Sequence, residues 1–77
     1  MTGNSGKRGL NGTAVRVIRE ALGVRNGDLA ARVGVTAGTL THIERDGRQV
    51  SPATQRAIAD SLGIPLEAIT FPRSEAA

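Results

Sequence analysis

Polar side chains that can bind nucleic acid recur at short intervals in the middle of the chain. His42 can donate to or accept from a purine edge, and Arg45 can bind a phosphate or guanine. The hydroxyl groups of Thr39 and Thr41 can bond to base edges or to phosphates. Ala37 offers only a methyl group, which suits the methyl group of thymine. This set indicates a surface that would bind DNA largely through phosphate contacts and shape.

The elements that must position these side chains are two short amphipathic helices joined by a tight turn. Between residues 26 and 45, apolar or small residues recur at helical spacing, namely Leu29, Ala30, Val33, Val35, Leu40 and Ile43. Gly34 can adopt a positive φ at the end of the first helix, and Thr36 can cap the second. The pattern predicts a helix-turn-helix, which in a small basic protein usually binds DNA.

The faces of the second helix follow from its periodicity. With Leu40 and Ile43 in the core, the opposite face carries Gly38, His42 and Arg45. We therefore predict a recognition helix over residues 36–46, whose N-terminal end enters the major groove first. Gly38 has two interpretations: it allows close approach of the helix backbone to DNA, or it is tolerated on an exposed surface.

Three further residues border this helix. Asn26 can cap the first helix of the pair or reach a phosphate, and Thr36 can hold a phosphate together with the first-turn amides. Arg48 lies in the loop that follows and can contact the DNA backbone. Each of these polar residues also has a plain interpretation as a solvated surface side chain. The predicted DNA-binding set is Asn26, Thr36, Ala37, Gly38, Thr39, Thr41, His42, Arg45 and Arg48.

The rest of the sequence predicts further helices and a tail at each end. Asn11 or Thr13 can cap a first helix, whose apolar stripe is Val15, Ile18 and Leu22. Ser51 followed by Pro52 is a strong start signal for another helix, with an apolar stripe of Ile58, Ala59 and Leu62. A last short helix can begin at Pro65. We expect a flexible N-terminal arm over 1–10, a helix-turn-helix DNA-binding domain over 11–70 and a C-terminal tail over 71–77. The fold class is all-α, a compact bundle of four to five helices.

Composition narrows the functional classes. The chain has 77 residues, no cysteine and one histidine, so we expect one domain without a disulfide and without a metal site. No 18-residue apolar stretch predicts a membrane span, and no apolar secretory signal precedes the domain, so a cytoplasmic protein is expected. The net charge of +3 permits phosphate contact without establishing it. No nucleophile with a positioned base and no Gly-rich phosphate loop is present, so neither an enzyme nor a cofactor is expected.

Apolar residues crowd near the C-terminus, at Ile64, Leu66, Ile69 and Phe71. Their density exceeds what one short helix needs for its own packing. A homodimer through this segment would set two recognition helices roughly 34 Å apart, one turn of DNA.

The chain resembles the phage repressor and Cro-type helix-turn-helix family, also called XRE-type, over about residues 12–70. The residues that carry the resemblance are Arg19, Leu29–Ala30, Gly34–Val35, Leu40, Ile43–Glu44 and Leu62–Gly63. It implies a lambda-repressor-like fold and a structural ion pair between Arg19 and Glu44. The chain departs from the family at Asn26, where glutamine is usual, and at Asp46, which stands before the glycine that commonly follows the Glu-Arg pair.

Two functions remain in competition. The favoured one is a sequence-specific regulator of transcription that binds double-stranded DNA as a repressor or Cro-like protein. The alternative is a protein-binding module on the same fold, similar to an antirepressor or antitoxin, with a regulatory protein as partner. Salt dependence separates them, because counterion release makes DNA binding fall steeply as salt rises.

Overall fold

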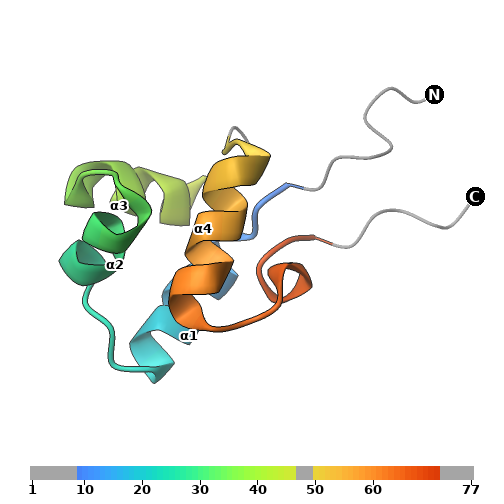
Figure 1. Ribbon diagram of the computed structural model, residues 1–77, viewed down its shortest axis with the longest axis horizontal. Helices are drawn as coiled ribbons and strands as arrows, with labels where there is room; N and C mark the ends of the chain where they lie inside the picture. The colour runs from blue at the N-terminus through green and yellow to red at the C-terminus, as the bar shows by residue number, and fades with distance from the viewer. Residues whose placement is uncertain (1–8, 47–49, 72–77) are drawn as a thin grey trace, which may run out of the picture.

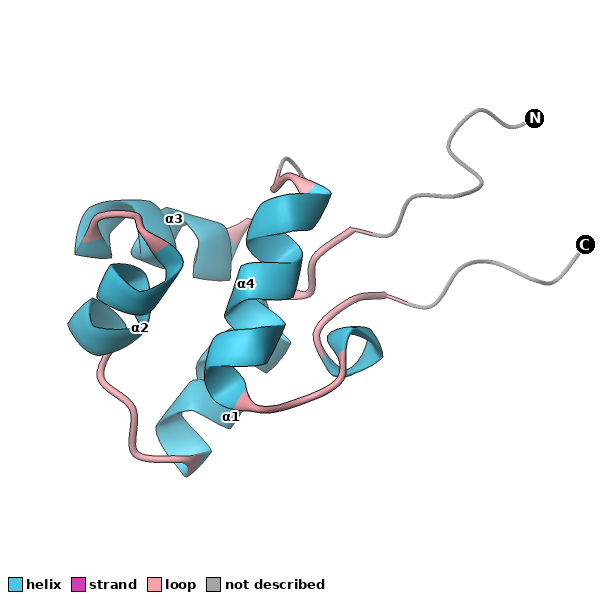
Figure 2. Ribbon diagram, viewed as in Figure 1, coloured by secondary structure: helices cyan, strands magenta, loops and turns pink. Residues whose placement is uncertain are grey.

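The computed structural model describes residues 9–46 and 50–71, which form four α-helices and one 3-10 turn. These elements are α1 (Gly12–Ala21), α2 (Asn26–Val33), α3 (Ala37–Arg45), α4 (Pro52–Leu62) and the 3-10 turn η1 (Leu66–Ala68). Helices α2 and α3 pack together at one end, and α4 lies across the middle with α1 behind its lower half (Figure 1). Figure 2 shows helices joined by loops and no strand in the described part. The predicted all-α fold is confirmed.

Side chains cap three of the four helices at their N-termini. The side-chain oxygens of Asn11, Thr36 and Ser51 each accept a first-turn backbone N–H at 3.1–3.2 Å. Such a cap stabilises a helix by about 1 kcal/mol. Helix α2 differs, because Arg25 occupies its N-cap position and makes no side-chain cap. Its first backbone N–H groups therefore have no side-chain acceptor.

The turn between α2 and α3 depends on one glycine. Gly34 has a φ of 90° and donates its N–H to the carbonyl oxygen of Ala30 at 2.9 Å. A side chain with a β-carbon is strained in this left-handed conformation. The prediction that Gly34 ends the first helix of the pair is confirmed.

Every helix contributes to one core. Helix α2 packs against α3 and α4, and α1 packs against the same two helices. The largest fully buried side chains are Leu10, Val15, Leu29, Leu40, Ile58 and Ile69. The expected burial of Leu22 is wrong: at the C-cap of α1 its side chain is 55% exposed.

Helix α1 begins in direct backbone contact with the last turn of α3. A β-carbon on Gly12 would come within 2.5 Å of the carbonyl oxygens of Ile43 and Glu44. Only glycine allows the two helices to approach this closely. No role for Gly12 was predicted from the sequence.

The two ends of the described domain pair with each other. Leu10 and Thr70 form an isolated antiparallel bridge, flanked by hydrogen bonds from Asn11 N–H to the carbonyl of Ile69 and from Phe71 N–H to that of Gly9. Leu10 is only 1% exposed. Residues 9 and 10, which were expected in the arm over 1–10, are therefore part of the folded domain: the backbone of Gly9 and Leu10 pairs with the C-terminal end, and the side chain of Leu10 is buried in the core. The expected last helix is the short turn η1.

The C-terminal apolar segment is explained mostly by packing within the chain. Ile69 is fully buried, and Ile64 and Leu66 are partly buried against the core. Phe71 alone of the four stays largely exposed, at 51%. Of the four apolar residues that suggested a dimer surface, all of them described, only Phe71 therefore remains available for a contact with a second protomer.

Candidate nucleic-acid interface

The outward side of α3 is open to solvent along its whole length. Leu40 and Ile43 are buried beneath it. The exposed residues, which we call the α3 face, are Ala37, Gly38, Thr39, Thr41, His42 and Arg45. Thr36 and Asp46 are the caps of α3, so the helix itself is one residue shorter at each end than the range 36–46. Nine residues make a helix about 13 Å long, which is similar to the width of the major groove.

Thr36 and Thr39 hold each other in a fixed arrangement. The Thr36 hydroxyl accepts the backbone N–H of Thr39 at 3.1 Å and donates to the Thr39 hydroxyl oxygen at 2.9 Å. Thr36 is therefore engaged as a helix cap. The proton of the Thr39 hydroxyl remains to be donated to a group outside the chain.

Asn26 joins the start of α2 to the middle of α3. Its side-chain amide donates to the hydroxyl oxygen of Thr41 at 3.4 Å. As with Thr39, the hydroxyl oxygen of Thr41 accepts within the chain, so its proton is available to be donated to a group outside. Outside acceptors that suit two such donors are purine N7, guanine O6, thymine O4 and phosphate oxygens, whereas the cytosine amino group is a donor.

The last turn of α3 supplies the basic side chains of the α3 face. His42 and Arg45 are both exposed there. Among the contacts of the described residues, neither side chain has a hydrogen-bond or ion-pair partner. Both are free to bind a phosphate or a base edge.

A buried ion pair fixes α3 against α1. The Arg19 guanidinium donates from Nε to Glu44 Oε2 at 2.8 Å and from Nη2 to Oε1 at 3.3 Å. The two residues are 8% and 7% exposed. The hydrogen bonds to Glu44 raise the pKa of Arg19 above its ordinary value. Arg19 Nη1 also donates to the carbonyl oxygen of Val24 at 2.9 Å, which ties the loop before α2 to the same group. These contacts position the α3 face without belonging to it.

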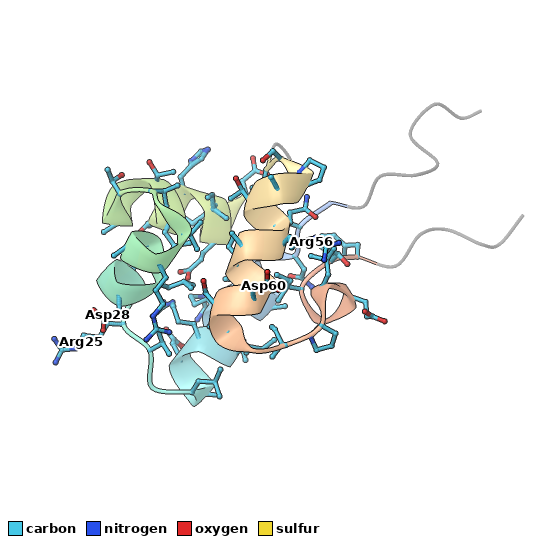
Figure 3. The ribbon with its side chains drawn as sticks, viewed as in Figure 1. Arg25, Asp28, Arg56 and Asp60 are labelled. Carbon is cyan, nitrogen blue, oxygen red and sulfur yellow. The ribbon has the colours of Figure 1, made fainter. Side chains whose placement is uncertain are left out.

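Charge on the described residues is balanced. They carry six basic and six acidic side chains, so the net charge of +3 arises from residues outside them. Arg48, one of the predicted contacts, lies outside the described residues. Arg25 lies at the start of α2 and points away from the protein, with Asp28 close by (Figure 3). An electrostatic contribution to binding from the described part must therefore come from single, well-placed groups such as Arg25 and Arg45.

Two features of this site were missed by sequence reasoning. The predicted residues were treated one by one, whereas Thr36 with Thr39 and Asn26 with Thr41 act as hydrogen-bonded pairs. The first pair had a local signal, because a threonine at the cap and another three residues later are neighbours on the helix. The second pair is set by the crossing of α2 and α3 and had no such signal.

Over 9–46 and 50–71, no group of three His, Cys, Asp or Glu side chains could hold a metal ion. None of the helices in these ranges has the length and apolarity to cross a bilayer.

Comparison with known proteins gives one family. A protein-family model described as a helix-turn-helix domain matches residues 12–69. No curated protein and no solved structure matches the chain. The matched range covers α1 to η1 and includes the α3 face and the ion pair beneath it. The chain therefore belongs to the helix-turn-helix domain family of DNA-binding proteins.

Proposed function

We propose that this protein is a sequence-specific regulator of transcription that places α3 in the major groove of double-stranded DNA. The observation that carries the proposal is the α3 face itself. It is exposed over its full length, while Leu40 and Ile43 anchor it from below. The oxygens of its two threonine hydroxyls already accept a hydrogen bond within the chain, so each hydroxyl has its proton available to donate to DNA.

The finer assignment is a repressor or Cro-like protein of the XRE type that acts in the cytoplasm. It rests on the resemblance of the residues around the helix-turn-helix, together with the Arg19–Glu44 geometry that the resemblance implies. Phosphate contacts from Asn26, Arg45 and Arg48 would position the protein, and Ala37, Thr39, Thr41 and His42 would meet base edges.

Selection of bound sequences from random duplexes, followed by a salt series on the enriched duplex, tests this proposal. We expect one motif to be enriched and affinity to fall linearly with salt on logarithmic axes. Arg45→Ala should weaken binding and lower that slope by about one unit, because one phosphate contact is lost. Arg56→Ala is the matched control: it removes the same charge from the exposed side of α4, outside the helix-turn-helix, and should leave the slope nearly unchanged. Equal effects of the two variants would remove Arg45 from the interface.

A second experiment tests whether the threonine hydroxyls donate hydrogen bonds to DNA. Replacing guanine or adenine by its 7-deaza analogue removes one groove acceptor and leaves Watson–Crick pairing intact. We expect at least one such replacement within the enriched motif to weaken binding about tenfold, equivalent to about 1.4 kcal/mol, and Thr41→Val to abolish that sensitivity. Wild-type binding that is unaffected by every 7-deaza replacement would contradict donor readout at N7.

The proposed assembly is a homodimer. In the C-terminal apolar segment, among the described residues, Phe71 is the one exposed side chain that could form the contact between protomers. A two-fold symmetric enriched motif would support it. Sedimentation should then give a dimer on DNA, and Phe71→Ser should weaken the second protomer's binding. A strict monomer, both free and on DNA, would rule it out.

The protein-binding alternative is favoured by one observation, the balanced charge of the described residues. Failure to enrich any duplex would move the assignment to this class. The α3 face would then be the surface on which to seek a protein partner.

A further inference from the structure

The fold does not require glycine at two of the helical positions that carry it. In the described residues, helices contain Gly12, Gly27 and Gly38. Gly12 is required by its contact with the last turn of α3. At Gly27 and Gly38, an added β-carbon would meet no other part of the chain within 4 Å, and the backbone is helical. Alanine would fit at both positions and would stabilise the helix, because glycine loses more conformational freedom on folding.

These two glycines occupy the same place in the two helices of the helix-turn-helix. Gly27 is the second residue of α2, Gly38 is the second residue of α3, and both are exposed. The residue before Gly27 is Asn26, whose amide bonds to Thr41 in the middle of α3. Both glycines therefore border the surface on which the predicted contacts gather. Each of them makes its helix less stable than alanine at the same position would.

Resting on the proposed DNA-binding function, we propose that Gly27 and Gly38 set how closely the two helices approach the duplex. At Gly38 the backbone of α3 lies against base edges in the groove. At Gly27 the backbone of α2 lies against a phosphodiester strand. A β-carbon at either position holds its helix away from DNA and lengthens the neighbouring hydrogen bonds, which weaken steeply with poorer geometry.

The two positions have different consequences for specificity. The neighbours of Gly38 on the α3 face are Ala37 and Thr39, so a displaced α3 loses base contacts, which carry sequence discrimination. A displaced α2 loses phosphate contacts, which contribute equally for all sequences. Gly38 is therefore a specificity-determining residue, and Gly27 is an affinity-determining one.

The experiment compares Gly38→Ala and Gly27→Ala with wild type by thermal unfolding and by fluorescence anisotropy on the enriched duplex and a scrambled one. We expect the Tm of both variants to rise and their affinity for the enriched duplex to fall at least fivefold. Gly38→Ala should also reduce the ratio of enriched to scrambled affinity, whereas Gly27→Ala should weaken both duplexes alike. Ser61→Ala, near the C-terminal end of α4, is the control: its Tm should rise because alanine favours the helix, with no change in affinity.

Each outcome decides the inference. A variant that is more stable and binds the enriched duplex as well as wild type overturns the role of its glycine and leaves the proposed function standing. A lower Tm for either variant overturns the premise that its β-carbon has room. A wild-type protein that binds no duplex overturns the proposed function and, with it, both assignments.

Discussion

Removing Glu44 should cost this domain most of its stability. The Arg19 guanidinium, 8% exposed, makes its two shortest carboxylate contacts to Glu44, at 2.8 and 3.3 Å. In Glu44→Ala it keeps only the carbonyl of Val24 and a 3.9 Å approach to Glu20. An uncompensated buried charge of this kind costs about 3–5 kcal/mol. A core of this size supplies roughly 3–5 kcal/mol in total, so most of the variant should be unfolded at 25 °C.

Urea unfolding followed by circular dichroism measures this loss, with trimethylamine oxide added to bring the variant into the folded range. Arg19→Met combined with Glu44→Leu should recover most of the stability, since apolar replacement of a buried pair is often neutral or better. The control is Arg16→Ala, which breaks an exposed 3.5 Å pair with Glu20, leaves Arg19 and Glu44 untouched and should cost less than about 0.5 kcal/mol. A loss below about 1 kcal/mol for Glu44→Ala would refute the reasoning, because the pair would then behave as a surface one.

Three further substitutions probe the fold. Leu10→Ala should lower the free energy of unfolding by about 2–5 kcal/mol, because the side chain is fully buried; a urea midpoint equal to wild type would return residue 10 to the arm. Gly34→Ala should cost about 1–2 kcal/mol in the same assay because of its φ of 90°, and a stabilising effect would show that the turn is not left-handed. Asn11→Ala should cost about 1 kcal/mol and lower the Tm by several degrees, whereas an unchanged Tm would show that α1 does not depend on its cap.

Much of the helix-turn-helix could be predicted from the sequence because its signals are local. The caps at Thr36 and Ser51 and the left-handed turn at Gly34 depend on residues within one helical turn. The burial of Leu40 and Ile43, and with it the exposure of the opposite side of α3, follows from a repeat of 3.6 residues. Helical periodicity misplaced Leu22 because the repeat assigns a residue to one face of a helix and does not say whether another element covers that face at this point.

The residues and the family resemblance of this sequence were enough to assign an all-α helix-turn-helix, its helix starts and the helix that carries the candidate contacts, because these depend on neighbours along the chain. Apart from the Arg19–Glu44 pair, which the resemblance implied, only the tertiary structure decided which distant segments meet. It brought Leu10 beside Thr70, Gly12 onto the backbone of Glu44, and the amide of Asn26 onto the hydroxyl of Thr41. No local pattern encodes these contacts, since each depends on how two helices or chain ends cross. That crossing also gives the Thr41 hydroxyl oxygen its donor and leaves Gly38 with open space in front of it.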